Sequence, residues 1–180
     1  MSTFLTSDFH LGDKIAIDLM RRPFKSYQRM TDVLIANTNA RAGADDTVIH
    51  VGDFVSYGAD RGIEGARISG REYLKRFNSN VILLEGNHDR NNRVVPVCKM
   101  LTLDLSSEIR NVTVSHYPSY MDPLVPKTAG HVHICGHVHD LWKYKFSDDG
   151  VLNINVGVDA WNYQIVSIPE ILKLISKIRK

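Results

Sequence analysis

Five short apolar stretches of the chain each run directly into a segment that carries Asp, Asn or His. These polar segments are residues 8–10, 52–53, 86–89, 116 and 136–139. A short, continuous apolar run is typical of a strand that is buried in a sheet. In α/β sheets, functional groups gather in the crevice at the carboxyl ends of the strands. The pattern therefore predicts a layered α/β fold in which the five segments converge on one site.

The first half of the sequence alternates strands with helices, which is typical of an α/β layer. Strands are predicted at residues 3–7, 46–51 and 80–84. A helix is predicted over residues 26–42, where apolar positions recur on one face. Ser69 and Glu72 have the spacing of a capping box, which predicts a second helix that buries Leu74 and Phe77.

The second half of the sequence has strands without long helices between them. These strands are predicted at residues 112–115, 132–135 and 151–156. The pattern predicts a second sheet packed on the first. A capping box at Ser167 and Glu170 predicts a terminal helix. Because a chain of 180 residues has room for one well-buried core, we expect a single domain over residues 1–180.

Charge and composition argue against several classes of protein. The formal net charge of +2 is too small to indicate a nucleic-acid binder, although nucleic acid stays open as a partner. We expect neither a secretory signal nor a membrane partner, because no apolar stretch has the required length or flanks. Cys98 and Cys135 lack the spacing of a metal-binding pair, and we interpret them as reduced thiols of a cytoplasmic protein. Nothing in the sequence indicates an oligomeric state.

The polar segments offer carboxylate oxygen and imidazole nitrogen without thiolate. This donor set suits Mn, Fe or Zn better than a structural zinc finger or a calcium cage. In an extended chain Asp8 and His10 lie on one face, as do His137 and His139. The donors exceed the needs of one tetrahedral ion, and a carboxylate shared by two ions roughly 3.5–4 Å apart would explain them. The sequence therefore predicts a binuclear metal site of the kind used for phosphoryl displacement.

Taken together and in order, these segments resemble the calcineurin-like metallophosphoesterase family. The family pattern D-x-H, G-D, G-N-H-D/E, H, G-H-x-H is complete here between Asp8 and His139. The resemblance implies a four-layer α/β/β/α sandwich of two mixed sheets. The later strings H-Y-P at 116–118 and N-V-G-V-D-A-W-N-Y at 155–163 look like a small bacterial and phage branch of this family.

The resemblance also implies roles for individual residues. Ligands of the first metal would be Asp8, His10, Asp53 and His139. Ligands of the second metal would be Asp53, Asn87, His116 and His137, which makes Asp53 the bridge. His88 and Asp89 would be the catalytic residues, with His88 facing the phosphate, and Asn87 and Arg90 would contact the substrate. The nucleophile would be a hydroxide activated by two divalent ions, with Mn favoured and Fe, Zn, Ni and Mg as alternatives.

Two departures from relatives bear on the activity. Protein Ser/Thr phosphatases of this superfamily carry G-D-x-V-D-R-G, whose second Asp supports the catalytic histidine and whose Arg holds phosphate. Ser56 and Tyr57 stand at those two positions here, which argues against a protein phosphatase. Small relatives often have a second histidine shortly after D-x-H, where this chain has Asp13. A carboxylate there would contact a metal through water or cap the following turn, and we favour the cap.

Other histidines and both tryptophans lie outside the family pattern. His50 lies within a predicted strand, and we expect it to be structural. His131 and His133 lie before or within the strand that leads to residue 136, and we interpret them as structural groups or supports for a metal ligand. Trp142 and Trp161 would line the cleft or pack in the core.

The expected function is hydrolysis of a small phosphodiester, such as a cyclic nucleotide. The alternatives are a phosphomonoesterase, a nuclease acting on nucleic-acid ends, and a non-catalytic protein-binding scaffold. The complete set of ligands argues against a scaffold. DNA-repair nucleases of this superfamily add a capping domain, for which the roughly forty residues after His139 leave no room. The sequence does not indicate the physiological substrate, because specificity comes from loops.

Overall fold

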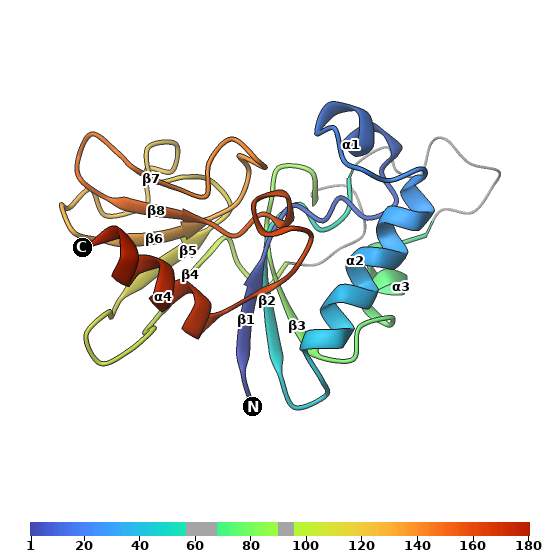
Figure 1. Ribbon diagram of the computed structural model, residues 1–180, viewed down its shortest axis with the longest axis horizontal. Helices are drawn as coiled ribbons and strands as arrows, with labels where there is room; N and C mark the ends of the chain where they lie inside the picture. Colours follow the sequence, from blue (N-terminus) through green and yellow to red (C-terminus); the bar gives the residue numbers. More distant parts are fainter. Residues whose placement is uncertain (57–67, 90–95) are drawn as a thin grey trace.

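The predicted strands form two mixed sheets that face each other in the computed structural model, which describes residues 1–56, 68–89 and 96–180 (Figure 1). The first sheet has the strand order β3-β2-β1-β9. Its strands are β1 (Thr3–Thr6), β2 (Thr47–Val51), β3 (Asn80–Leu84) and β9 (Val166–Ser167). The first three run parallel, and β9 pairs with β1 in the antiparallel sense.

The second sheet has the strand order β4-β5-β6-β8-β7. Its strands are β4 (Met100–Leu103), β5 (Val112–Ser115), β6 (Val132–Cys135), β7 (Tyr144–Phe146) and β8 (Leu152–Asn155). The three central strands β5, β6 and β8 run parallel, and β4 and β7 pair with them in the antiparallel sense at the two edges. The parallel strands are buried along their whole length, as expected for strands covered on both faces.

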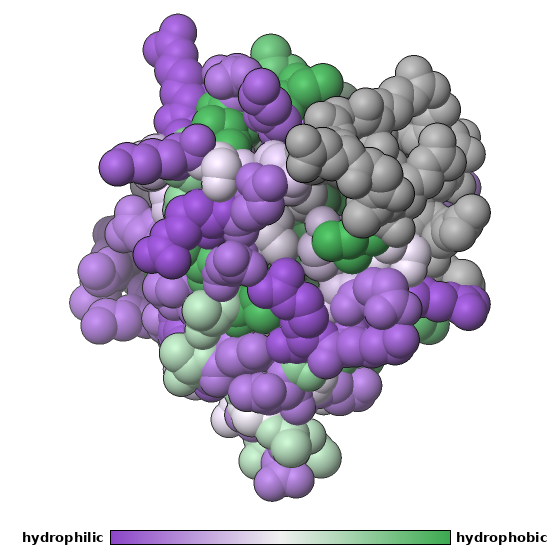
Figure 2. Space-filling view, turned by 90° about the vertical axis from the view of Figure 1, so that its right-hand side faces the viewer, coloured by the Kyte–Doolittle hydropathy of each residue, from purple (hydrophilic) through white to green (hydrophobic). Residues whose placement is uncertain are grey.

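Alternating side chains of the first sheet face two separate cores. Phe4 and Val48 pack with Met30 and Leu34 of helix α2 (Tyr27–Arg41) on the outer face. Leu5 packs in the second core, between the sheets. Figure 1 accordingly shows the first sheet between α2 and the second sheet, with α3 (Gly70–Leu74) beside α2. The surface on this side of the molecule is mostly hydrophilic (Figure 2).

The terminal helix α4 (Ile168–Ile178) begins at the predicted capping box, in which Ser167 and Glu170 exchange hydrogen bonds. Ile171 and Ile175 are buried in the same hydrophobic cluster as the facing strands of the two sheets. The predicted fold class, α/β with two mixed sheets, is therefore confirmed. Among the described residues no helix has the length and apolar character needed to cross a membrane.

The outer face of the second sheet is polar and is covered by the segment that follows β5. The hydroxyl of Thr113 lies 2.8 Å from ring nitrogens of both His131 and His133. The other ring nitrogen of His133 donates to the carbonyl oxygen of Tyr117 at 2.9 Å. The structural role predicted for these two histidines is thus confirmed, and His133 fixes the chain directly after His116.

Some elements differ from the sequence prediction. The sequence did not predict the short helix α1 (Lys14–Leu19) or the strands β4, β7 and β9. At the capping box predicted for Ser69 and Glu72, only one hydrogen bond of the motif is seen: the Ser69 side chain accepts the backbone N–H of Glu72. The buried residues of that helix are Gly70 and Tyr73, whereas Leu74 and the following Phe77 are only partly buried against the first core. This helix has five residues, which is too short for a periodic apolar face to form.

Candidate metal centre

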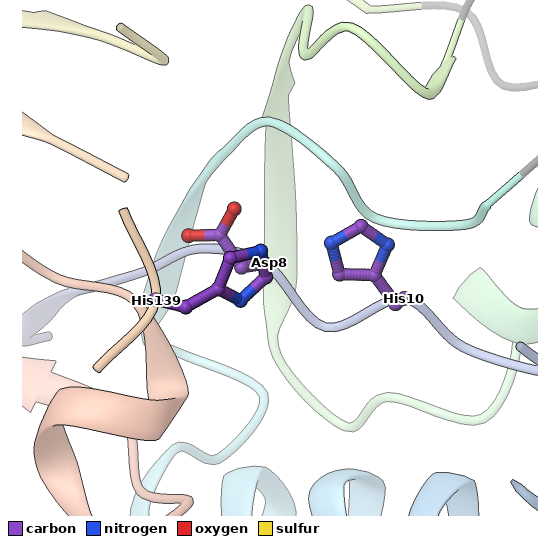
Figure 3. A group of neighbouring side chains, drawn as sticks. All are labelled: Asp8, His10 and His139. Carbon is purple, nitrogen blue, oxygen red and sulfur yellow. The ribbon is translucent and has the colours of Figure 1, made fainter. Parts of the chain in front are cut away.

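The loops that follow β1, β2, β3, β5 and β6 bring the predicted ligands together. Ligand atoms of Asp8, His10 and His139 lie within 4.8 Å of one another. Ligand atoms of Asp8, Asp53 and His116 form a second group, and these atoms also lie within 4.8 Å of one another. Figure 3 shows the carboxylate of Asp8 beside the ring of His139, with His10 farther along the same loop. Residues from four different loops therefore share one buried site.

Asp53 lies between the two predicted halves of this site. Its Oδ2 is 3.7 Å from Nε2 of His10 and 3.4 Å from Nε2 of His116. Its Oδ1 accepts the backbone N–H of His88 at 2.8 Å. One carboxylate thus faces a histidine predicted for the first metal and a histidine predicted for the second. Asp8 belongs to both groups of donors as well, so the site holds two carboxylates placed to be shared.

Asn87 completes the second half of the site. Its Oδ1 lies 3.0 Å from Nε2 of His116 and 3.1 Å from Nδ1 of His137. The Nδ1–H of His116 donates to the carbonyl oxygen of Val51 at 2.9 Å. This hydrogen bond leaves Nε2 of His116 free to act as a ligand. Asn87 is exposed, so this half of the site is open to solvent.

His10 shows that these donors fit a cation. Its Nε2 is buried and has no hydrogen-bond partner among the described residues. Its Nδ1 contacts the hydroxyl of Ser56. Burial holds the pKa of His10 well below its usual value, despite the opposing charge of Asp53, so the ring is neutral. Because a buried nitrogen without a partner is rare, and a neutral imidazole is the form that binds metal, the site is suited to a metal ion.

Burial and neighbouring charges shift the pKa values of the ionisable groups in the site. Burial opposes the charge of His116, but its hydrogen bond to Asp53 and the charges of Asp8 and Asp53 raise its pKa to about 9. Burial likewise opposes the charge of Asp53, but His116 and His10 hold the pKa of Asp53 below its usual value. Burial raises the pKa of Asp8. Burial and the charge of His116 lower the pKa of His137 to about 4.

The backbone of the site adopts a conformation that L-residues rarely use. Asp8, His10, Asp53, His137 and His139 all have positive φ, between 48° and 71°. Each such residue outside glycine costs on the order of 1–3 kcal/mol and is typical of functional sites. The turned backbone aims these side chains inward from the ends of β1, β2 and β6.

Two glycines are needed because the loops approach each other closely. A Cβ atom at Gly86 would lie 2.2 Å from both N and Oδ1 of Asp53. A Cβ atom at Gly136 would lie 1.9 Å from Oγ of Ser7 and 2.6 Å from Oδ2 of Asp8. No side chain can be accommodated at these distances, so the glycines of the family pattern allow the loops to contact each other.

Asp89, predicted with the catalytic group, has a different role in the structure. Its Oδ2 accepts the backbone N–H groups of Asp53 at 2.8 Å and Gly86 at 2.9 Å. Its Oδ1 accepts those of Phe54 at 2.9 Å and Val55 at 3.4 Å. The carboxylate is buried and its oxygens are engaged by backbone amides. We therefore assign Asp89 to holding the loops after β2 and β3 together, and not to contact with the reacting atoms.

His88 lies at the edge of the site. Its ring centroid is 5.1 Å from that of His10, at an angle of 72°. Its backbone N–H is fixed by Asp53, and the side chain is partly exposed. The position is suitable for a group that faces a bound substrate. Arg90 and Tyr57 lie outside the described residues.

Two residues of the site were not found by sequence reasoning. Asp159, in the short 3-10 helix η2 (Val158–Trp161), accepts a hydrogen bond from Nδ1 of His139 at 2.9 Å. Arg22 binds Asp159 through two hydrogen bonds of 2.8 and 2.7 Å. The string N-V-G-V-D marked Asp159 as part of a pattern, but nothing in it pointed to His139. No signal in the sequence distinguishes Arg22 from a surface arginine.

The remaining residues singled out from the sequence are structural. Asp13 caps α1 by accepting the N–H of Ile15 at 2.8 Å, which confirms the predicted cap. His50 is fully buried, with its ring 4.6 Å from that of Phe9. Trp161 packs against the second core and donates to a backbone carbonyl. Trp142 is partly buried.

A cavity of about 360 Å³ adjoins the Asn87 and His116 half of the site. One wall is formed by Tyr117, Met121 and Leu124, which are largely apolar. Lys99 and Glu85 also line the cavity and form an ion pair at 3.8 Å. The volume lies in the range of sites that bind small organic molecules.

Known proteins resemble this chain in sequence and in fold. Residues 1–164 match the model of the calcineurin-like phosphoesterase superfamily domain. The uncharacterized protein MJ1445 of Methanocaldococcus jannaschii is 28% identical over 174 residues, which cover 97% of this chain and 91% of that protein. The crystal structure of the protein of unknown function AQ665 from Aquifex aeolicus superposes with a TM-score of 0.67 at 23% identity, covering 96% of this chain and 98% of that one. Nuclease MPE of Pseudomonas putida gives a TM-score of 0.44 at 22% identity, covering 76% of this chain and 61% of that one.

Proposed function

The chain belongs to the calcineurin-like phosphoesterase superfamily, and on this premise we propose that it hydrolyses a small phosphodiester, such as a cyclic nucleotide, with two divalent metal ions. The observation that carries the proposal is the pair of adjoining donor groups, which share the carboxylate of Asp8, together with the carboxylate of Asp53, which faces a histidine of each group. A non-catalytic scaffold would not need a buried His10 nitrogen without a partner.

The predicted ligands divide between two ions. Asp8, His10, Asp53 and His139 would hold the first ion, and Asp53, Asn87, His116 and His137 would hold the second. When bound, two such ions polarise phosphoryl oxygens and lower the pKa of water. Mn is the metal we propose, because mixed carboxylate, amide and imidazole donors without thiolate suit it.

His88 would supply the proton in this reaction. A water molecule would release one proton to solvent as its oxygen forms a bond to phosphorus, and the bond from phosphorus to the ester oxygen would break. The leaving oxygen would then take a proton from the imidazole of His88, which stands at the open edge of the site. His88 would regain from solvent the proton that it gives to the leaving oxygen. The Oδ1 of Asp53 accepts the backbone N–H of His88 and so holds the backbone of His88 in place.

Two observations support a small diester over a phosphoprotein. Ser56, at the position where phosphoprotein phosphatases carry an Asp, contacts the ring of His10 and is buried. The cavity beside Asn87 has room for an organic group attached to the phosphate. Lys99 and Glu85, which line this cavity, form an ion pair with each other. Cytoplasmic location is part of this proposal, supported by the two free cysteines.

A comparison of esters tests the proposal. We would measure kcat/KM of the Mn-loaded protein for bis-nitrophenyl phosphate and nitrophenyl phosphate, then for 2′,3′-cyclic nucleotides and a phosphopeptide. We expect the diesters to be preferred. The His88→Ala variant, purified identically, controls for contaminating phosphatases. Preference for the monoester or phosphopeptide would refute the diester assignment, and failure to hydrolyse any ester would refute the hydrolase.

A further inference from the structure

We propose that Arg22 and Asp159 are positioning residues that hold His139 and the Asp8 loop in the geometry required by the first metal ion. This inference rests on the proposed metal site. It concerns two residues that lie outside the family pattern and come from segments far apart in the sequence. They contact each other and, respectively, Asp8 and His139.

Asp159 orients the ring of His139. Its Oδ2 accepts the Nδ1–H of His139 at 2.9 Å, which leaves Nε2 as the nitrogen with a free lone pair. Figure 3 shows this ring beside the carboxylate of Asp8. Metal-binding histidines commonly donate their second N–H to a carboxylate, which fixes the tautomer and the ring orientation. Asp159 occupies that position for His139.

Arg22 joins Asp159 to the loop that carries Asp8. Its Nε and Nη2 donate to the two oxygens of Asp159 at 2.8 and 2.7 Å, in the two-pronged geometry typical of strong pairs. Its Nη2 also donates to the backbone carbonyl of Asp8 at 2.6 Å. Its Nη1 donates to the carbonyl of Phe9 at 2.9 Å. One guanidinium thus fixes the backbone of one ligand and, through Asp159, the side chain of another.

The burial of this pair argues for a function in the site. The side chains of Arg22 and Asp159 are 0% and 3% exposed. A buried ion pair is poor as a source of stability, because removing both charges from water offsets their attraction. The positive φ of Asp8 and His139 shows that the backbone there needs external support. Arg22 supports the backbone of the Asp8 loop through the carbonyls of Asp8 and Phe9, and Asp159 holds the ring of His139.

The chain offers a matched control pair. Arg41 donates to Glu170 at 2.6 Å and to the backbone carbonyl of Ile165 at 2.5 Å. The chemistry is the same as in the Arg22 pair, but its side chains are 30% and 42% exposed. Neither residue contacts a predicted metal ligand. Glu170→Gln is therefore the control for loss of an arginine–carboxylate pair.

Metal binding without turnover tests the inference. Mn²⁺ would be titrated by calorimetry into chelator-treated wild type, Asp159→Asn, Asp159→Ala, Arg22→Lys and Glu170→Gln. We expect wild type and Glu170→Gln to bind two ions. We expect Asp159→Ala to bind one ion roughly 10–100-fold more weakly and the other unchanged, with smaller effects for Asp159→Asn and Arg22→Lys. The spectroscopic signature of a coupled Mn pair should weaken in parallel.

The outcomes separate the inference from the function on which it rests. If wild type binds no pair of ions, the proposed metal site is refuted and this inference with it. If wild type binds two ions and the Asp159 and Arg22 variants bind both with the same affinity, only the inference is refuted. Equal weakening of both ions would also refute it, because it would indicate general loss of structure. Asp159→Asn keeps the shape of the side chain, so the test stands if Asp159→Ala does not fold.

Discussion

Replacing Asp89 by Asn separates a positioning role from a catalytic one. The substitution keeps the shape of the side chain but turns one hydrogen-bond acceptor into a donor. If the amide nitrogen replaces Oδ2, the N–H groups of Asp53 and Gly86, which donate at 2.8 and 2.9 Å, lose their acceptor. If it replaces Oδ1, those of Phe54 and Val55 lose theirs. Two buried N–H groups face a donor in either orientation.

The expected loss of stability follows from those two groups. A buried polar group left without a partner costs about 1–3 kcal/mol, so the free energy of unfolding should fall by about 2–6 kcal/mol. Urea denaturation of the chelator-treated protein measures this change. Asp46→Asn is the control, because Asp46 also accepts two backbone N–H groups, at 2.7 and 3.0 Å, but from an exposed position. We expect a much smaller change there.

The reasoning would be refuted by a specific result. If Asp89→Asn unfolded at the same urea concentration as wild type but lost turnover, Asp89 would act on the reacting atoms. A positioning role instead predicts that stability and metal affinity fall together, with residual turnover in the fraction that is folded and loaded.

Three further predictions concern the metal centre. Removal of metal by a chelator should abolish activity and Mn should restore it, as activity and metal analysis would show; full turnover in excess chelator would contradict the mechanism. Asp53→Ala should lose both ions, whereas His10→Ala should lose chiefly the first, because Asp53 faces a histidine of each half and His10 belongs to the first half; metal content decides this. His88→Ala should keep its metal but lose turnover by about 10²–10⁴-fold, less for esters with good leaving groups; an equal loss for all esters would point to electrostatic stabilisation instead.

The sequence predicted the buried strands and their polar ends well, for a physical reason. The strands β2, β5 and β6 are short, nearly fully buried and bordered by loops, and each carries valine or isoleucine that packs in a core. The missed strands lack this signal: all three residues of β7 are exposed, and β9 has two residues. Their pairing is decided by neighbouring strands and not by their own side chains.

In the site, sequence reasoning found side chains that follow strands but not those that support them. Asp8, Asp53 and His116 come directly after buried strands, where topology brings loops together. Arg22 and Asp159 are in contact across more than a hundred residues. Nothing local marks Arg22, and the string that contains Asp159 does not connect it with His139. The position of Asp89 in the pattern does not reveal that its carboxylate accepts backbone N–H groups of the loops after β2 and β3.

Hydrogen bonds among the loops hold the candidate ligands close together. The N–H of Asp8 donates to the carbonyl of Gly52 at 3.1 Å, and that of His10 to the carbonyl of Asp53 at 3.0 Å. These two bonds join the loops after β1 and β2 through backbone groups that are not candidate ligands. The N–H of His137 donates to the Asp8 carboxylate at 3.0 Å, which joins the loop after β6 to a candidate ligand itself. The positive φ of these ligands costs free energy, and contacts of this kind within the protein offset that cost.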